Sequence, residues 1–403
     1  MMGGIALKIM LANFSKMVND SGGAAKVFCA FANEMHARGH EVTAVYCDDK
    51  EGDFFYPVNE NVRAINLQHA YGQHIAFPKR LKIKRELLRV VDIRRARSVN
   101  DSFIEENLLG NIRRALEEVS PHVIVSWQPA ASKSFLMDIQ TDVPVITMSH
   151  GDPEDYFHTY PVAELPAIGR SAVNQVLIPS FQESLKKRFP DLKTVAIGNV
   201  VPQYEERAEL EAEKETYRII FLARLVKNHK RPHILVEAFI KLAKEFPQWQ
   251  AELWGADDKL AYTKSMQRKI DQAGLSDRIK FMGTTHDVAS ILKKGDIFAF
   301  PSAYEGWGMS LTEAMSMGLP AVGFKNCSAV NELIADGETG FLAEDGVDAF
   351  AEKLRKLMSD KDLRCKMGTA AKQAMKPYRA ENIWHTWEKL LQEVVDDSSG
   401  KKR

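Results

Sequence analysis

Short apolar runs separated by amphipathic segments recur along the whole chain. Residues 6–12 are almost wholly apolar and predict a buried strand, and residues 24–39, after a polar loop, have the periodicity of a helix. Residues 41–46 predict the next strand. Strand, glycine-containing loop, helix and strand form a βαβ unit, which implies parallel strands.

The same alternation continues in two series, which predicts two successive doubly wound α/β halves. The strands expected in the first half are 123–126, 143–148, 176–178 and 194–197, with helices at 103–118, 130–139 and 182–189. The second half is expected to have strands at 217–222, 250–254, 279–282, 297–300 and 320–324, with helices at 232–245, 262–273 and 310–317.

The expected domains follow from these two series. Residues 1–202 form the first domain and 203–376 the second, and the charged segment 204–216 is interpreted as a solvated linker. In 377–403 an apolar stripe recurs at helical spacing, which predicts a last helix over 380–395 with one buried face. The stripe consists of Trp384, Trp387, Leu390, Leu391 and Val394.

Composition narrows the class of protein. Lys plus Arg and Asp plus Glu both total 54, which argues against a nucleic-acid binder with an overall basic surface. The four cysteines are scattered without the spacing of a zinc site. No signal peptide or run of about 20 apolar residues is found, so a cytoplasmic location is expected.

One segment, 78–97, stands out by its nine basic residues interleaved with leucine, isoleucine and valine. A basic amphipathic helix can lie on an anionic membrane surface. The alternative is a solvated helix face whose charges pair with acidic neighbours. The sequence leaves both interpretations open.

The strongest chemical signal is the stretch 301–315, which follows an apolar strand and opens a helix. Gly306 and Gly308 expose backbone N–H groups at the start of that helix, which is a site for an anion such as a diphosphate. Glu305 and Glu313 flank this start, and a carboxylate can accept hydrogen bonds from a sugar diol. Alternatively, Glu313 is an ordinary surface residue of the helix.

Three weaker signals also follow predicted strands. Arg224 and Lys230 offer two cations for a diphosphate, although each can equally be a surface cation. His150 ends a strand and has acidic neighbours, at 152, 154 and 155, that can set its charge; a structural role is the alternative. Gly22 and Gly23 let a backbone approach a phosphate, or form a simple turn.

Together these elements resemble the retaining glycosyltransferases of the GT-B fold, specifically glycosyltransferase family four, also called group 1. Glu305 and Glu313 match the family's Glu-x7-Glu motif, and Arg224 with Lys230 is similar to its "GRL–K" element. His150 resembles the family's first-domain histidine. The pair Gly22-Gly23 resembles its "GG" loop, and Phe281-Met282-Gly283 resembles its "F-G" strand end near the base.

The resemblance implies two Rossmann-like domains facing a cleft, with a C-terminal helix crossing back to the first. The second domain would bind a nucleotide diphosphate sugar, with a UDP-sugar favoured, and the first a glycan or lipid-linked acceptor in cell-surface polysaccharide synthesis. Glu313 would hold the ribose, and Glu305 the sugar being transferred. The diphosphate would be held by cations and by loop amides; this set is Arg224, Lys230, Gly306, Trp307, Gly308, Met309 and Ser310.

The resemblance further implies that no metal or cofactor is required. The two cations and the backbone dipoles would take its place. A hexosyl unit would be transferred with retention, and the leaving phosphate would accept the acceptor's proton. Two departures from the family pattern are Ala223, where glycine is usual, and an Arg-to-Lys spacing one residue longer, which makes Lys227 an alternative to Lys230.

Two other functions remain compatible with this sequence. A sugar-nucleotide epimerase or hydrolase on the same frame would need an acid/base set near His150. A non-catalytic nucleotide-sugar-binding protein would keep the domains but would not need all four charged residues. A dehydrogenase is disfavoured because no dinucleotide fingerprint follows the first strand.

Overall fold

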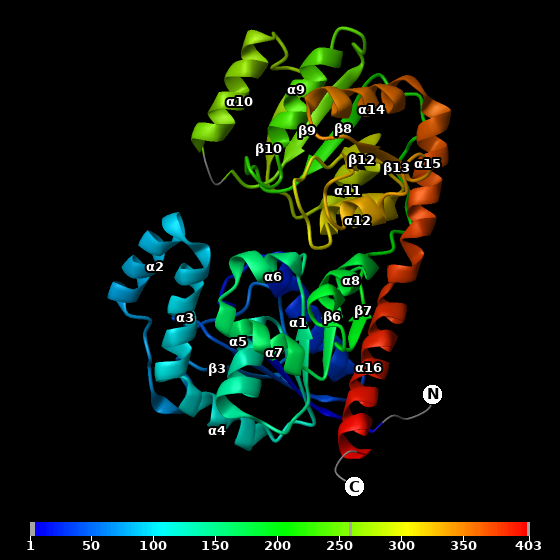
Figure 1. The fold of residues 1–403 in the computed structure, drawn as a ribbon. Helices are drawn as coiled ribbons and strands as arrows, with labels where there is room; N and C mark the ends of the chain where they lie inside the picture. The colour runs from blue at the N-terminus through cyan, green and yellow to red at the C-terminus, as the bar shows by residue number, and fades with distance from the viewer. Residues whose placement is uncertain (1–4, 258–259, 401–403) are drawn as a thin grey trace. The chain divides into compact units, whose positions relative to one another are not determined.

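The computed structural model describes residues 5–257 and 260–400, which divide into two compact units (Figure 1). The first unit runs to Gly198 and includes the chain again from Ile383 onward, and the second is Asn199–Asn382. Each unit has one parallel sheet with helices packed against it. The expected α/β class with two Rossmann-like units is therefore confirmed.

The sheet of the first unit has the strand order β3-β2-β1-β4-β5-β6-β7. The strands are parallel, and the direction in which the chain adds them reverses at β1: β2 and β3 lie on one side of β1, and β4 to β7 on the other. The strands are β1 (Lys8–Asn13), β2 (Glu41–Tyr46), β3 (Arg63–Asn66), β4 (Val123–Ser126), β5 (Val145–Met148), β6 (Val173–Val176) and β7 (Thr194–Ala196).

Along β1, successive side chains point to opposite faces of the sheet, and apolar residues on both faces are buried. Met10 and Ala12 face a core formed with Phe103, Ile104 and other apolar residues of the helices that follow β3. The helices of this unit are α1 (Gly23–Ala37), α2 (Lys79–Val91), α3 (Ile93–Asn107), α4 (Leu109–Val119), α5 (Pro129–Lys133), α6 (Glu154–Thr159), α7 (Leu165–Arg170) and α8 (Pro179–Arg188). Shorter helical turns are η1 (Ala70–Gly72), η2 (Ser134–Ile139) and η3 (Val162–Glu164).

The second unit repeats this arrangement with the strand order β10-β9-β8-β11-β12-β13. Its strands are β8 (Tyr217–Leu222), β9 (Trp249–Trp254), β10 (Ile279–Gly283), β11 (Ile297–Ala299), β12 (Ala321–Phe324) and β13 (Gly340–Ala343). Its helices are α9 (Pro232–Leu242), α10 (Leu260–Gln272), α11 (Val288–Lys294), α12 (Met309–Met317), α13 (Val330–Leu333), α14 (Val347–Ser359) and α15 (Lys361–Ala374), followed by η4 (Lys376–Tyr378).

The last helix, α16 (Ala380–Gly400), packs on the first unit, as expected. Trp384 and Trp387 contact the ring of Phe31 in α1 edge-on, with ring centroids 5.9 and 5.0 Å apart. Arg38 adds an ion pair of 3.0 Å to Glu388. The apolar stripe that predicted this helix is thus its buried face.

The interpretation of 204–216 as a solvated linker is wrong. This segment belongs to the second unit and packs along it, because the Ala208 N–H donates to the Met317 carbonyl and Leu210 is buried. Lys372 donates to the carbonyls of Tyr204 and Glu206, both at 2.7 Å. Most charged side chains of this segment are exposed, but Lys214 is largely buried and pairs with the buried Asp296 at 2.8 Å.

The basic segment 78–97 is two helices rather than one. Asp92 ends α2 and caps α3, because its carboxylate accepts hydrogen bonds from the N–H groups of Arg94 and Arg95. No residue of α2 is buried. Other strand and helix limits also differ: β6 ends at Val176 instead of 178, and the helix expected over 130–139 changes at Ser134 from α5 to the π-helical turn η2.

Two further observations concern the chain as a whole. All four cysteines are free thiols, and three of them are buried. Over the described part of the chain, helices are either too short or too polar to cross a bilayer.

A buried carboxyl pair joins α3 to η3 in the first unit. Burial, and after it the charge of Asp101, raises the pKa of Glu164 to about 9, so Glu164 keeps its proton and donates it to Asp101. Nearby, Lys133 pairs with Asp138 at 2.8 Å and with Glu105 at 3.0 Å. The charges of Arg97 and Lys133 act on Glu164 in the opposite direction and lower its pKa.

This pair makes the stability of the first unit depend on pH. The pKa of Glu164 is higher in the folded than in the unfolded chain, so the folded state binds more protons and loses stability as pH rises from about 5 to about 9. We expect Glu164→Gln, which stays neutral, to remove most of this loss. Melting temperatures of the full chain across this range measure it. Glu117→Gln, an exposed change in α4, is the control, and equal pH profiles for all three proteins would contradict the assignment.

Candidate functional site

The two strand-end loops singled out in the second half of the sequence lie next to each other. β8 and β11 are neighbouring parallel strands at the point where the order of the sheet reverses. The loop after β8 carries Arg224 and Lys230, and the loop after β11 carries Glu305. Ligands of doubly wound sheets bind beyond the carboxyl ends of strands at such a point.

Lys230 and Glu305 form an ion pair at this junction. The Glu305 side chain is only 7% exposed and that of Lys230 only 15%. A buried carboxylate needs a close cation to remain charged, and Lys230 supplies it. The exposed Lys227 is the weaker candidate for this role, so the structure gives Lys230 the place beside Glu305.

His229 is a neighbour that the sequence analysis missed. Its ring stacks on Tyr304 with centroids 4.2 Å apart and an angle of 1° between the planes. Its Nε2 lies 3.7 Å from the Glu305 carboxylate. Burial, followed by the charge of Lys230, lowers the pKa of His229, so its ring is neutral at pH 7. Only its position next to Lys230 pointed to this role.

Arg231 holds the two loops together. Its Nε donates to the Pro301 carbonyl at 2.9 Å, and its Nη1 pairs with Asp345 at 2.9 Å. The Ala303 N–H in turn donates to the His229 carbonyl at 2.8 Å. Glu305 therefore lies in a loop whose backbone is bound before any ligand arrives.

Gly308 directs the same loop into α12. Its φ of +79° is a conformation that other residues rarely adopt, and a Cβ there would lie 3.2 Å from the ring of Phe300. No side chain at Gly308 caps the helix, so the N–H groups at Met309 and Ser310 begin α12 without a side-chain acceptor from that position. Such a helix start can receive an anion.

Glu313 and Arg224 lie in the same unit as this pair. Glu313 is half-buried in α12, and its charge adds to burial in raising the pKa of Tyr204 to about 12. Arg224 is exposed, and its charge contributes to lowering the pKa of His229. Arg224 therefore lies close enough to act on the loop that holds Lys230.

Three further residues of the expected donor site are Trp307, Gly283 and Gly306. Trp307 is buried and packs edge-on against Tyr378 with centroids 4.9 Å apart, so its side chain belongs to the core and only its backbone is available to a ligand. Gly283 ends β10 with a φ of +75°, and its carbonyl accepts from the Gly255 N–H at 2.7 Å. Gly306 is half-buried in the loop between Glu305 and Trp307.

The ends of β8 and β9 approach each other closely beside Ala223. A Cβ on Gly255, just after β9, would lie 1.9 Å from the Ala223 carbonyl oxygen. This contact is with the backbone, so position 255 requires glycine whatever side chain residue 223 carries. The structure gives no separate reason for alanine at 223.

The remaining expected residues, His150, Gly22 and Gly23, lie in the first unit. His150 follows β5 and its ring lies 4.8 Å from that of Trp127. Burial alone lowers its pKa to about 4, so the hypothesis that its acidic neighbours set its charge is wrong, and the ring is neutral. Gly22 caps α1 and donates to Asp20 at 2.8 Å, while Gly23 is the first residue of the helix.

The part of the chain that matches a known protein family lies in the second unit. Residues 202–374, most of the second unit, match the family described as glycosyl transferases group 1. Among curated relatives, an exopolysaccharide phosphotransferase of Streptomyces coelicolor is 25% identical over 72% of the chain and 31% of its own length. The N-acetyl-alpha-D-glucosaminyl L-malate synthase of Bacillus anthracis is 28% identical over 57% of the chain and 61% of its own length.

The chain thus spans less than two thirds of the length of these relatives. Among solved structures, a sucrose-phosphate synthase of Thermosynechococcus elongatus superposes with a TM-score of 0.74, covering 96% of this chain and 99% of that one at 15% identity. This likeness shows that the fold is shared with a GT-B glycosyltransferase. The second unit thus matches the family of glycosyl transferases group 1 over residues 202–374.

Proposed function

We propose that this chain transfers a hexosyl unit from a nucleotide diphosphate sugar, with a UDP-sugar favoured, to a glycan or lipid-linked acceptor. The observation that carries the proposal is the buried Lys230–Glu305 pair at the junction of β8 and β11, beside the start of α12. A cation, a carboxylate and free backbone N–H groups are the chemistry that a diphosphate sugar requires. The match of residues 202–374 to the glycosyl transferases group 1 family supports it.

The proposed roles follow from position and charge. Arg224, Lys230 and the backbone at the start of α12 bind the diphosphate and stabilise its negative charge as it leaves. Glu305 accepts a hydrogen bond from a hydroxyl of the donor sugar, and Glu313 from the ribose. The acceptor hydroxyl attacks the anomeric carbon on the face that the diphosphate leaves, and its proton passes to the leaving phosphate oxygen. The configuration is then retained.

The donor-site assignment predicts the effect of two substitutions. Arg224→Ala and Glu313→Ala should each lower the rate of transfer about tenfold or more, because each removes a contact that the transition state needs. Lys227→Ala, an exposed change in the same loop as Arg224, is the control. Sugar-nucleotide consumption and product formation with a panel of donors measure the rate. Near-normal rates for both variants would refute the assignment, and turnover without any acceptor would favour an epimerase or hydrolase.

The proposed reaction uses no metal ion, since the two cations take its place. The described residues offer no cluster of three His, Cys, Asp or Glu side chains suited to a metal. We expect transfer to continue at an unchanged rate after treatment with a strong chelator. Loss of activity with EDTA, restored by magnesium or manganese, would overturn this part of the proposal.

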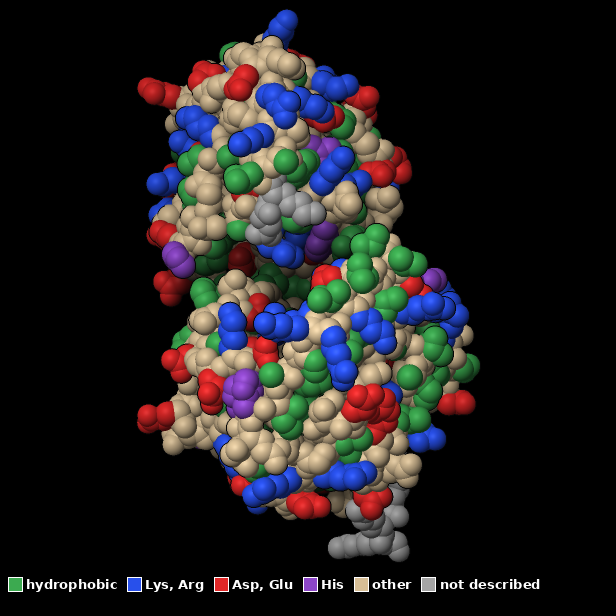
Figure 2. Space-filling view, turned by 90° about the vertical axis from the view of Figure 1, so that its left-hand side faces the viewer, with side chains coloured by type: hydrophobic (Ala, Val, Ile, Leu, Met, Phe, Trp, Pro, Cys, Tyr) green, Lys and Arg blue, Asp and Glu red, His purple; other side chains and the backbone are tan. Residues whose placement is uncertain are grey.

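We further propose that the acceptor is reached at an anionic membrane surface, with α2 as the contact. Four apolar residues of α2 are strongly exposed: Ile83 at 63%, Leu87 at 68%, Val90 at 88% and Val91 at 83%. In the face shown in Figure 2, apolar and basic side chains lie interspersed on the first unit. A helix with exposed apolar residues between cations suits the boundary of an anionic bilayer.

This contact predicts salt-sensitive binding to vesicles. The wild type should sediment with anionic vesicles at low salt, and Lys79→Glu with Lys84→Glu should weaken binding about tenfold or more, because each surface cation contributes about 1 kcal/mol. The matched control, Lys186→Glu with Lys187→Glu, makes the same charge change on α8. Wild type remaining in the supernatant, or equal losses in both double variants, would show that α2 is only a solvated helix.

A further inference from the structure

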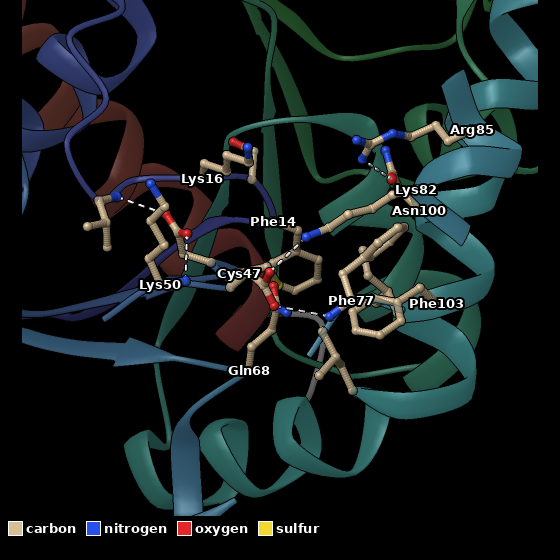
Figure 3. A pocket seen from close by; sticks show the side chains of 16 residues that line it. Phe14, Lys16, Cys47, Lys50, Gln68, Phe77, Lys82, Arg85, Asn100 and Phe103 are labelled. Atoms are coloured by element: carbon tan, nitrogen blue, oxygen red, sulfur yellow. Dashed lines mark hydrogen bonds and ion pairs between the residues drawn. The ribbon is translucent and has the colours of Figure 1, made fainter. Parts of the chain in front are cut away.

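A cavity of about 310 Å³ opens in the first unit at the carboxyl ends of β1 and β2. Its floor includes Phe14 and Cys47, at the ends of these strands, and its far wall is made by α2 and α3 (Figure 3). The sequence analysis assigned nothing to this place. Two adjacent aspartates, Asp48 and Asp49, line it.

The two carboxylates that line the cavity are already satisfied by the protein. Asp48 accepts from the N–H groups of Met17 and Val18, each at 2.9 Å, and from that of Lys50 at 3.0 Å. It therefore holds the loops after β1 and β2 in shape. Asp48 is also buried, so it offers little to a ligand.

Asp49 is bound in the same way. It accepts from the Phe77 N–H at 3.1 Å and from Lys82 Nζ at 2.9 Å. The hydrogen bond from Lys82 is the main reason that the pKa of Asp49 lies below its usual range. Both carboxylates thus hold the segments around the cavity in place, and their oxygen atoms already accept hydrogen bonds from the protein.

Cations outnumber these carboxylates around the cavity. Lys16 and Lys50 extend from the loops after β1 and β2, and Lys82 and Arg85 come from α2 on the other side (Figure 3). Arg85 donates to Asn100 at 3.1 Å. Lys16 and Lys50 are exposed and form no ion pair with any described residue. Lys82 pairs with Asp49 at 2.9 Å and Arg85 with Glu86 at 3.3 Å, so the two lysines Lys16 and Lys50 are the cations left to meet an anionic ligand.

One wall of the cavity is aromatic. Phe103 is buried and its ring lies 4.7 Å from that of Phe77, and the Arg85 guanidinium lies 5.3 Å from the centre of the Phe77 ring. Phe14 closes the floor. A ligand that fits this cavity has an anionic group near the lysines and a ring or apolar part against the phenyl side chains.

We propose that this cavity binds the acceptor through a phosphoryl or carboxylate group, with Lys16 and Lys50 as its contacts and the rest of the acceptor against Phe77 and Phe103. The assignment of the ligand as acceptor rests on the proposed transferase function. The anion site itself rests on the cavity alone. The chemical class of acceptor that follows is an anionic one, not a neutral glycan end.

The test uses the full chain with phenyl phosphate, benzoate and phenol as probes in titration calorimetry. Wild type should bind phenyl phosphate or benzoate about tenfold or more tightly than phenol, and the stronger of the two shows whether the site prefers phosphoryl or carboxylate. Lys16→Gln with Lys50→Gln should weaken anion binding about tenfold or more. Lys186→Gln with Lys187→Gln on α8 is the matched control and should not change it.

Two results would overturn the anion site: wild type that binds neither anion more tightly than phenol, or equal anion binding by both double variants. Both variants change only exposed lysines, and circular dichroism checks that they fold. UDP binding, measured in parallel, separates this site from the donor site. If the wild type binds the anion probes but not UDP, the transferase proposal is refuted and the cavity remains an anion site. If the wild type binds UDP but not the anion probes, only the cavity proposal is refuted.

Discussion

Parallel pairing of the strands is the constraint on which the rest of the structure depends. A parallel strand inside a sheet covered by helices is buried on both faces, so it has room for few polar side chains. Polar side chains that can contact a ligand are therefore placed in the loops at strand ends. In the second unit these are the loops after β8 and β11, and in the first unit the loops after β1 and β2.

At such a strand end, the Lys230–Glu305 pair shows how a buried charge is stabilised by an oppositely charged partner. A carboxylate that is 7% exposed is unfavourable without a cation, and removing one partner of such a pair typically costs about 3–5 kcal/mol. The bonds from Arg231 and the stacking of His229 on Tyr304 hold both loops in place. A diphosphate entering this site would meet a lysine that is already oriented, and would share it with Glu305.

Local patterns were enough to predict much of this arrangement. The apolar run at 297–300, the glycines at 306 and 308 and the two glutamates predicted a strand, a loop and a helix start in the order observed, because each depends on neighbours in sequence. The stripe from Trp384 to Val394 predicted α16 and its buried face for the same reason, while the resemblance to GT-B proteins indicated the unit on which it packs.

Features that depend on distant partners were not predictable in this way. Residues 204–216 look solvated by composition, yet the Ala208 N–H donates to the carbonyl of Met317 in α12, more than a hundred residues away, and Leu210 is buried. The stacking of His229 on Tyr304 and the shared proton of Asp101 and Glu164 join segments far apart in the chain. The cavity in the first unit likewise appears only when the loops after two strands meet α2.

Helix α2 takes part in two surfaces at once. Lys82 and Arg85 line the cavity, while Ile83, Leu87 and Val90 point to solvent, and no residue of the helix is buried. One helix would therefore contact both a ligand in the cavity and a surface bound on its outer side. Free energies of binding are reciprocal, so any lipid that orders α2 and thereby favours an anion in the cavity must itself be held more tightly, by the same factor, once that anion is bound. An acceptor anchored in a membrane would then help to keep the enzyme there.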